Sequence, residues 1–439
     1  MHLFIYNIFL LLYSIGIKIT ALWNPKARLW LNGRKDIWAR IAEVRGRPDR
    51  HREEADSQPP LVWMHCSSLG EFEQGRPVLE ALRQQHPAMQ IVVTFFSPSG
   101  YEVRKNYSGA DHVVYLPMDS KAAARKFLAL VQPSLVIWIK YEYWFYYLTE
   151  LKKKHIPCIL VSGIFRKDQP FFKWYGRLHR YMLESFSHLF VQTERSKQLL
   201  GTIGFSNNVT IGGDTRFDRV VQIAEQFEPI PVIEQFCGNA PVIVAGSTWP
   251  EDEEELDHYA NTHPEVKVII APHEINEAHL QEVEKLFKNA IRYSQYKAQS
   301  TGATSGNNAL PIAIGTANTL IIDNIGMLSK LYKYATITYI GGGFGDDGVH
   351  NVLEAAVYGR PVVFGPVYDK YIEAVELVQD GGGLVINTAL EAEQTFNTLL
   401  ADAGAYTSAC EAARNYVYSN KGATESIIQF IQENRLLTS

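Results

Sequence analysis

The chain has 439 residues, 46% of them hydrophobic and 20% charged, which is typical of a globular protein too long for a single core. Its net charge of -5 gives no overall basic field and argues against a protein that coats nucleic acid. The four cysteines have no Cys-x-x-Cys spacing, so the sequence predicts neither a zinc site nor a disulfide framework, and a reducing compartment fits best.

The first 23 residues predict a membrane anchor. Leu3 to Trp23 are nearly all apolar, and a helix of that length reaches roughly 31 Å, close to the ~30 Å hydrocarbon layer. By the positive-inside rule, the basic residues that follow place the rest of the chain in the cytoplasm; they are Lys26, Arg28, Arg34, Lys35 and Arg40. Trp23, Trp30 and Trp38 suit the membrane interface. A helix lying in the interface, a helix packed into the protein and a signal peptide are the alternatives.

Short apolar runs alternate with helical stretches from residue 60 onward, which is typical of parallel α/β sheets. The first series predicts strands at Leu61–His65, Ile91–Phe95, His112–Leu116, Leu135–Ile139, Cys158–Ser162, Leu189–Gln192 and Val209–Gly212. The second predicts strands at Pro241–Gly246, Val266–Ala271, Thr319–Asp323, Ala335–Gly341, Pro361–Phe364 and Gly383–Ile386.

These series predict an anchor at 1–23, a Rossmann-like domain at 24–220, a linker at 221–240 and a second Rossmann-like domain at 241–439. Residues 294–308 are polar and predict a surface loop, and residues 390–437 predict helices. The expected fold is α/β, of the GT-B arrangement of glycosyltransferases, in which two doubly wound domains face each other across a cleft.

Three segments of the first domain carry candidate chemistry. Glu71 lies where the first strand turns into a helix that Ser67 or Ser68 can cap, and the helix dipole is expected to keep its carboxylate ionised as a general base. A favourable charge in a first helical turn is the alternative interpretation. Lys140 and Glu142 follow another strand and could hold an acidic sugar or form a structural pair. Arg216 could neutralise a leaving phosphate or pair with Asp214 or Asp218.

The stretch from Ile340 to Ala356 is the most informative part of the second domain. A strand ends, glycines turn the chain, and a helix is predicted to open at His350 or Asn351, with Glu354 one turn in. Backbone amides at a helix start bind anions, and a carboxylate can accept hydrogen bonds from a ribose. Pro272-His273 and Ile325-Gly326-Met327 follow other strands and could contact a base, or serve as turns with a capping role.

Two other interpretations of the glycine-rich loop are weaker. Gly343-x-Gly345-x-x-Gly348 matches a dinucleotide-binding pattern, with Asp369 about twenty residues on. Asp346 and Asp347 inside the loop would repel a pyrophosphate, and the match follows the fourth strand of its domain instead of the first. No third ligand at useful spacing accompanies these two aspartates, so no metal site is predicted.

Seven collinear segments together resemble the 3-deoxy-D-manno-octulosonic acid (Kdo) transferases of lipopolysaccharide and lipid A biosynthesis. They are the apolar start with its basic flank, His65-Cys-Ser-Ser-Leu-Gly-Glu71, Thr94-Phe-Phe-Ser-Pro-Ser-Gly100, Tyr115-Leu-Pro-Met-Asp119, Glu142-Tyr-Trp144, Gly213-Asp-Thr-Arg-Phe-Asp218 and Gly341 through Ala356.

The resemblance implies a metal-independent GT-B enzyme without a cofactor, which transfers Kdo from CMP-Kdo to a lipid A precursor with inversion. It would work at the cytoplasmic face of the inner membrane, with Glu71 as general base. Lys140 and Arg216 fall on the family's charge-stabilising positions. Its CMP contacts fall on Pro272, His273, Ile325, Gly326, Met327, Asn351, Val352, Leu353 and Glu354.

The chain departs from the family pattern at two positions. Lys140-Tyr-Glu142-Tyr-Trp144 stands where the family often has Glu-x-Glu-x-Trp, and Arg216 stands where it has Lys. The change of charge at Lys140 leaves its role open, with Glu142 as the alternative. A transferase using a UDP-sugar and a non-catalytic membrane protein that binds a nucleotide sugar are the rival functions.

Overall fold

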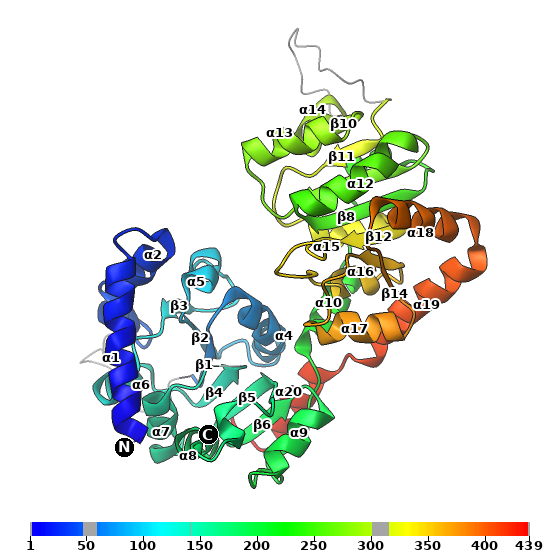
Figure 1. Ribbon diagram of the computed structural model, residues 1–439. Helices are drawn as coiled ribbons and strands as arrows, with labels where there is room; N and C mark the ends of the chain where they lie inside the picture. The colour runs from blue at the N-terminus through cyan, green and yellow to red at the C-terminus, as the bar shows by residue number, and fades with distance from the viewer. Residues whose placement is uncertain (1, 47–58, 141, 301–315, 438–439) are drawn as a thin grey trace. The chain divides into compact units, whose positions relative to one another are not determined.

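The computed structural model describes residues 2–46, 59–140, 142–300 and 316–437, and the chain divides into two compact units (Figure 1). Unit 1 comprises Met1–Arg219 and Gly422–Ser439, and unit 2 comprises Val220–Lys421. Each unit contains a parallel sheet of seven strands. The predicted α/β class with two doubly wound sheets is therefore confirmed.

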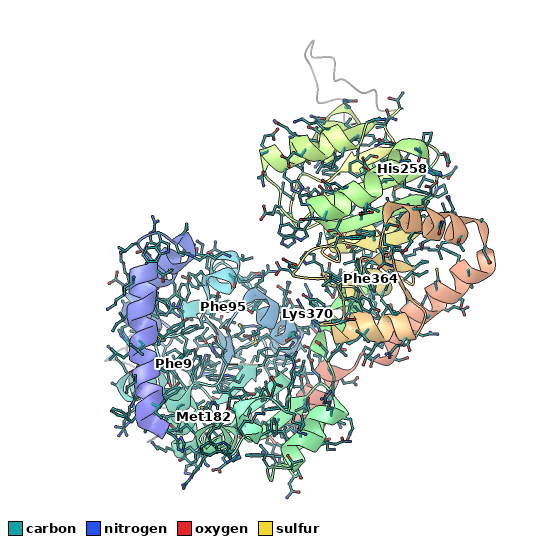
Figure 2. All side chains as sticks on the ribbon, viewed as in Figure 1. Phe9, Phe95, Met182, His258, Phe364 and Lys370 are labelled. Atoms are coloured by element: carbon teal, nitrogen blue, oxygen red, sulfur yellow. The ribbon has the colours of Figure 1, made fainter. Side chains whose placement is uncertain are left out.

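The sheet of unit 1 has the strand order β3-β2-β1-β4-β5-β6-β7. The order reverses at β1 and β4, which are paired neighbours with His65 opposite Trp138. Uninterrupted apolar runs form these strands because helices cover both faces of the sheet; Phe95 lies in this interior (Figure 2). The strands are β1 (Leu61–Cys66), β2 (Gln90–Phe95), β3 (His112–Tyr115), β4 (Leu135–Ile139), β5 (Cys158–Gly163), β6 (His188–Val191) and β7 (Val209–Ile211).

Two groups of helices accompany this sheet: α20, α4 and α5 pack side by side, and so do α3, α6, α7 and α8. Ser68, Ser120 and Thr193 cap α4, α6 and α9 through their side-chain oxygens. The helices are α3 (Ile37–Glu43), α4 (Leu69–Gln85), α5 (Pro98–Arg104), α6 (Lys121–Val131), α7 (Phe145–Lys153), η1 (Pro170–Phe172), α8 (Arg177–Leu183), α9 (Glu194–Gly201), α10 (Thr215–Glu225) and α20 (Ala423–Glu433).

Helix α1 (His2–Thr20) packs along unit 1 by one face. Tyr6, Leu10, Tyr13 and Ile17, spaced four, three and four residues apart, contact the core of unit 1. The other faces expose large apolar side chains, among them Phe4, Phe9, Leu11 and Leu12. By length and composition α1 could cross a membrane. The structure thus adds a docked face to the predicted anchor, which is not a separate domain.

Arg34 follows α2 (Pro25–Gly33) and packs against unit 1 with a half-buried side chain, a contact that its predicted place in the basic flank did not include. Its guanidinium lies over the rings of Trp30, Phe96 and Tyr115, at 3.6, 4.9 and 4.6 Å from their centroids. It donates to the backbone oxygens of Phe96 (2.9 Å) and Leu116 (3.2 Å). Burial lowers its pKa to about 9. Trp30, predicted at the interface, is also buried here.

Replacing Arg34 by leucine is expected to lower the free energy of unfolding by about 2–4 kcal/mol, because two inward carbonyls lose their donor and three rings lose a cation. Denaturant unfolding of the purified protein measures this difference. Arg28→Leu is the control, since Arg28 is exposed and should change stability by less than about 0.5 kcal/mol. Equal stability of both variants would mean that the Arg34 contacts contribute nothing.

The C-terminal helix α20 belongs to unit 1, whereas the predicted second domain ran to residue 439. Ile427, Ile428 and Ile431 enter the core of unit 1, and α20 packs beside α4. The Asp218 carboxylate accepts hydrogen bonds from the backbone amides of Gly422 (2.6 Å) and Thr424 (2.7 Å). Asp218 therefore holds the start of α20, and this contact joins residues 204 or more positions apart in the sequence.

The sheet of unit 2 has the order β10-β11-β9-β8-β12-β13-β14, and it reverses at β8 and β12. Strand β10 was not predicted. Phe364 of β13 lies in the interior of this unit (Figure 2). The strands are β8 (Val242–Thr248), β9 (Lys267–Pro272), β10 (Ala290–Arg292), β11 (Thr319–Ile321), β12 (Ile337–Ile340), β13 (Val362–Phe364) and β14 (Gly383–Val385).

Helices lie in the predicted linker, where a short helix was expected, and in the predicted surface loop of unit 2. Helix α11 fills much of the predicted linker and packs by Ile233 and Phe236, and α14 covers the first part of the predicted loop at 294–308; residues 301–308 lie outside the described residues. The helices are α11 (Pro231–Cys237), α12 (Pro250–Thr262), α13 (Glu277–Leu286), α14 (Tyr293–Ser300), α15 (Leu328–Leu331), η2 (Tyr332–Tyr334), α16 (Leu353–Ala356), α17 (Ile372–Gln379), α18 (Ala389–Ala401) and α19 (Ala403–Ser419).

Candidate active site

The candidate residues of each unit follow the strands at which its sheet order reverses. In unit 1, Glu71 follows β1, and Lys140 and Glu142 follow β4. In unit 2, the glycine-rich segment follows β12, the neighbour of β8. Open α/β sheets bind ligands outside the carboxyl ends of their strands at this reversal. The topology therefore brings candidate residues that are far apart in the sequence to one edge of each sheet.

Glu71 lies in the first turn of α4 and is only 8% exposed. Its carboxylate accepts a hydrogen bond from the backbone amide of Ser67, and its own amide donates to the Ser68 hydroxyl. Burial raises the pKa of Glu71 to about 7; the amide of Ser67 opposes this rise, and the charge of Glu142 adds to it. The prediction that the helix start keeps this pKa low is wrong, because desolvation outweighs the helix amides. A carboxyl group with a pKa near 7 suits a general base at neutral pH.

Lys140 and Glu142 lie on either side of Tyr141, which is outside the described residues. Lys140 adopts φ 51° at the end of β4, a left-handed conformation that costs a residue with a Cβ about 1–2 kcal/mol. The Glu142 carboxylate accepts a hydrogen bond from the Trp144 indole N–H (3.1 Å) and lies 3.7 Å from Nε2 of the buried His65. Backbone strain of this kind at a strand end is common in functional sites.

Arg216 pairs with Asp214, which is the structural alternative stated above. Its Nε and Nη2 atoms lie 2.9 and 2.7 Å from Oδ2 of Asp214, and its backbone amide donates to Oδ1. Burial opposes ionisation of Asp214, but Arg216 and then Lys140 lower its pKa below the ordinary value. The Gln74 amide of α4 also reaches Asp214 (3.4 Å). The segment that follows β7 thus returns to the helix that carries Glu71.

The four candidates of unit 1 form one electrostatic group. The charges of Glu142 and Lys140 act on Glu71, and that of Lys140 acts on Asp214, the partner of Arg216. One buried carboxyl group with a raised pKa, a second carboxylate and two cations can together accept a proton and stabilise negative charge. Among the described residues, no three His, Cys, Asp or Glu side chains are grouped so that they could hold a metal ion.

Three stacked rings line the reversal point of unit 2. His273 stacks against Trp249 and His350, with centroid distances of 4.7 and 4.5 Å, and the Trp249 indole N–H donates to Nε2 of His350 (2.9 Å). Burial, and then the neighbouring His273, lower the pKa of His350 to about 4. His350 is therefore neutral at pH 7. The stack connects the end of β8 to the segments after β9 and β12.

Asp252 fixes the loop that follows β12. Its carboxylate accepts hydrogen bonds from the Tyr339 hydroxyl, the Gly342 amide (both 2.7 Å) and the Trp249 amide (2.9 Å). A Cβ at Gly341 would lie 2.2 Å from the backbone oxygen of Ser247, so this loop approaches β8 as only glycine permits. The dinucleotide pattern lacks its helix, since α16 begins five residues after Gly348.

The predicted helix start at His350 or Asn351 is wrong by two or three residues. Helix α16 begins at Leu353 and is one turn long. The Asn351 side chain contacts the start of this helix: Nδ2 donates to Glu354 (2.9 Å), and Oδ1 accepts from the Leu353 amide (3.3 Å). Val352 and Leu353 are buried. Asn351 and Glu354 therefore form one hydrogen-bonded unit, and Val352 and Leu353 fix its position.

The other predicted donor contacts lie at neighbouring strand ends. Pro272 closes β9 opposite Thr248 of β8, and the His273 amide donates to the Thr248 carbonyl (2.9 Å). Ile325 is 91% exposed, Gly326 adopts φ 97°, and Met327 precedes α15. Because β11 adjoins β9, this exposed turn lies at the same edge of the sheet as His273.

Sequence reasoning missed several residues that shape the candidate site. Trp249 and Asp252 follow β8 and hold the glycine-rich loop after β12. Their signal was positional: Ser247-Thr248-Trp249-Pro250 follows the first strand of the second series, where ligand-binding turns of such sheets occur. The stacking partner His350 was noted only as a possible helix start.

Comparison with known proteins relates the chain to one family. Residues 39–219 match the model of the 3-deoxy-D-manno-octulosonic-acid transferase (kdotransferase) family. A bifunctional glycosyltransferase/methyltransferase of Fusobacterium nucleatum is 26% identical over 86% of this chain and 55% of its own length. The 3-deoxy-D-manno-octulosonic acid transferases of Rickettsia felis and Rickettsia bellii are 28% and 29% identical over 72% and 77% of this chain and 66% and 78% of their own lengths.

These matches confirm the predicted resemblance to the Kdo transferases. The chain spans about half the length of the Fusobacterium protein and about two thirds of the Rickettsia felis protein.

Solved structures of low sequence identity share the fold. The UDP-GlcNAc 2-epimerase of Neisseria meningitidis, bound to UDP-GlcNAc, has a TM-score of 0.60 at 17% identity and covers 85% of this chain and all of its own. MurG of Acinetobacter baumannii has a TM-score of 0.50 at 14% identity, with the same coverage of both chains. The predicted GT-B fold class is confirmed by these likenesses.

Proposed function

We propose that this chain transfers Kdo from CMP-Kdo to a lipid A precursor with inversion, and that Glu71 is the general base. The resemblance to Kdo transferases supports the sugar and the donor. The observation that carries the proposal is the buried Glu71 carboxyl group. Its pKa of about 7 allows the group to accept and release a proton at the pH of the cytoplasm.

In the proposed reaction, the Glu71 carboxylate accepts the proton of an acceptor hydroxyl. The acceptor oxygen then forms a bond to the anomeric carbon of the sugar, while the bond from that carbon to the CMP phosphate oxygen breaks. Negative charge moves onto the departing phosphate, and Arg216 is the proposed cation that stabilises it. Attack from the face opposite to the leaving group inverts the anomeric centre.

Lys140 stands where the family often has a glutamate, so we assign the charge-stabilising role of that glutamate to Glu142. Its carboxylate is held by the Trp144 indole and raises the pKa of Glu71, which makes Glu71 a stronger base. The Lys140 ammonium acts in the opposite direction on Glu71, and it also offers a cation to the carboxylate of an acidic sugar. Lys140 and Glu142 together therefore set the pKa of Glu71, and Lys140 suits a donor that carries a negative charge.

On the donor side, we assign CMP to the segments at the reversal point of unit 2. Glu354, held by Asn351, is the proposed acceptor for ribose hydroxyls, and the exposed turn at Ile325-Gly326-Met327 and the ring of His273 are the proposed contacts of the base. Pro272, Val352 and Leu353 shape this site through the backbone.

Asn351→Ala and Glu354→Gln are each expected to weaken CMP binding about tenfold, since each removes one hydrogen-bonding group worth about 1–1.5 kcal/mol. Isothermal titration with CMP measures the effect, and titration with UDP distinguishes a CMP-sugar from a UDP-sugar donor. Asp369→Asn is the control: it removes the acidic residue of the dinucleotide pattern and should leave CMP affinity unchanged. If only the Asp369→Asn control lost affinity for CMP, the nucleotide would bind near Asp369 and not at Glu354.

We further propose that α1 attaches the chain to the inner membrane with the two units on its cytoplasmic face. The exposed apolar faces of α1 and the basic residues Lys26 and Lys35 support this placement.

The decisive experiment for sugar transfer incubates the detergent-extracted protein with CMP-Kdo and a tetraacylated disaccharide phosphate and measures the mass of the lipid. If the protein binds CMP but the mass of the lipid does not change, the chain does not catalyse transfer. The rival function, a non-catalytic protein that binds a nucleotide sugar, would then be favoured.

A further inference from the structure

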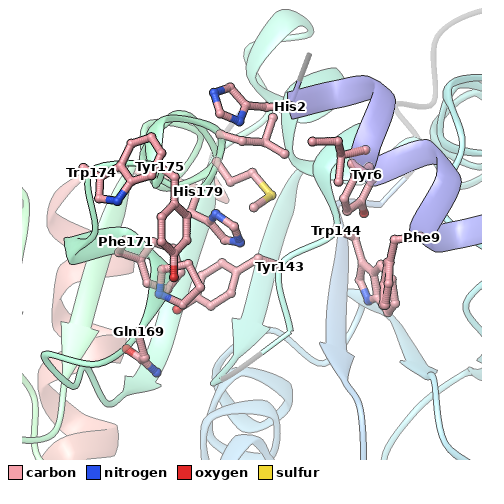
Figure 3. A pocket seen from close by; sticks show the side chains of 14 residues that line it. His2, Tyr6, Phe9, Tyr143, Trp144, Gln169, Phe171, Trp174, Tyr175 and His179 are labelled. Atoms are coloured by element: carbon pink, nitrogen blue, oxygen red, sulfur yellow. The ribbon is translucent and has the colours of Figure 1, made fainter.

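An apolar cavity of about 790 Å³ lies within unit 1, between the first half of α1 and the segment 169–182. Figure 3 shows aromatic side chains that line it, among them Phe9, Tyr143, Trp144 and Phe171. The aliphatic side chains of Ile5 and Leu178 line it as well. Trp174 stands at this cavity and is 91% exposed. A soluble protein rarely leaves a hollow of this size and polarity open, so a ligand of apolar chemistry is indicated.

Polar contacts hold the α1 wall of this cavity in place. The Tyr6 hydroxyl donates to the buried Asp119 carboxylate (2.6 Å) and accepts from the Phe145 amide (3.2 Å). The Tyr146 hydroxyl donates to the Asn7 side chain (2.8 Å). Since hydrogen bonds fix α1 on this side, the cavity is a built feature of unit 1 and not a gap left by a loosely attached helix.

One side chain, Trp144, both lines the cavity and contacts a candidate catalytic residue, Glu142. Trp144 lines the cavity, and its indole N–H donates to Glu142 (3.1 Å), whose charge acts on Glu71. A molecule whose apolar part fills the cavity would therefore contact Trp144, the side chain that holds the Glu142 carboxylate. Helix α1 forms one wall of the cavity, and its exposed apolar faces suit contact with lipid.

We propose that this cavity binds a fatty acyl chain of the sugar acceptor and thereby positions the acceptor's polar end next to Glu142 and Glu71. The identity of the acyl-bearing molecule as the acceptor rests on the proposed function. An acyl chain can pass from a bilayer along α1 into the cavity without exposure to water, and burial of each methylene group favours binding. The cavity thus selects a lipid acceptor over a free sugar.

Leu178→Trp in the full chain tests this site, because the larger ring fills the cavity from α8. The KM for an acylated acceptor is expected to rise about tenfold, the effect of displacing roughly two buried methylene groups, while kcat/KM for the deacylated acceptor stays within about twofold. Leu12→Trp is the matched control on the exposed face of α1 and should change neither value. Leu178→Ala, which enlarges the cavity, should shift the preference toward longer acyl chains.

The proposal would be overturned if neither Leu178 variant changed the KM for the acylated acceptor relative to the KM for the deacylated acceptor. So would a loss of vesicle binding in Leu178→Trp with an unchanged KM for the acylated acceptor in detergent, since the cavity would then hold a bilayer lipid.

A photoreactive fatty acid probe gives a readout that does not need catalysis. Crosslinks at Phe9, Phe171 or Leu178 that Leu178→Trp abolishes support the site, and their absence in an active enzyme refutes it. Crosslinks in a chain that transfers no sugar would refute the proposed function alone.

Discussion

Replacement of Glu71 by glutamine is expected to reduce sugar transfer by about 10²–10⁴-fold while CMP binding stays unchanged. Glutamine has nearly the same shape and can still accept the hydrogen bond from the Ser67 amide, but it cannot take a proton. Transfer is measured by single-turnover formation of the glycosylated lipid, and CMP binding by titration. Glu73→Gln, the same change two residues further along α4, is the control and should retain activity within about threefold.

The pH dependence gives the same hypothesis a second test. The active form of a base is the ionised carboxylate, so kcat/KM should rise with pH, reach half of its maximum near the Glu71 pKa of about 7, and level off about one pH unit higher. The residual activity of Glu71→Gln should lack this rise. A wild-type profile that is flat between pH 5 and 8, or a variant that keeps the rise, would assign the proton transfer to another group.

Stability provides a check that the Glu71→Gln variant is folded. The folded-state pKa of Glu71, about 7, is above its ordinary value of 4.5, so the folded protein binds this proton more tightly than the unfolded chain. Ionisation of Glu71 therefore reduces the stability of the protein as pH rises from about 4.5 to about 7. Because glutamine does not ionise, the variant should be at least as stable as the wild type at pH 8.

Arg216→Met is expected to lower the transfer rate by about 10²–10³-fold, the effect of removing one preorganised donor from a developing negative charge. Arg216→Lys should recover much of this loss, since the ammonium keeps the charge although it cannot form the bidentate pair. The measurement is kcat with saturating CMP-Kdo, and thermal unfolding monitors the fold.

Asp214 allows the catalytic and structural roles of Arg216 to be separated. Removal of Arg216 leaves the buried Asp214 carboxylate without its closest cation, which by itself would disturb the site. In the double variant Arg216→Met with Asp214→Asn, that uncompensated charge is absent. If transfer remains low in the double variant, Arg216 acts on the phosphate; if transfer returns, Arg216 serves only to neutralise Asp214.

Most strands could be predicted because their signal is local. Parallel strands buried on both faces are runs of apolar residues bounded by turns, and β4 has the predicted bounds Leu135–Ile139. Strand β10 was missed because it has three residues and only its pairing with β11 makes it a strand. Helix α20 was assigned to the wrong unit because its place depends on contacts with Asp218 and α4, which are distant in the sequence.

The places of the candidate residues at the ends of strands could be predicted, but their electrostatics could not. The helix start at Ser68 correctly located Glu71, yet the direction of its pKa depends on how much of the carboxyl group is buried, and sequence spacing does not report burial. Arg34 and Trp30 show the same limit. A basic residue beside an apolar helix suggests a membrane flank, and only packing shows that this guanidinium lies among three rings.

The amino-acid sequence by itself determined the alternation of strands and helices, the two series, the resemblance to Kdo transferases and the identity of the candidate residues, because these depend on local patterns. Only the tertiary structure decided that Glu71 is buried with a raised pKa, that Arg216 pairs with Asp214, and that α1 and α8 enclose an apolar cavity beside Trp144. Burial, charge pairing and cavities arise from contacts between distant segments, and these contacts exist only in the folded chain.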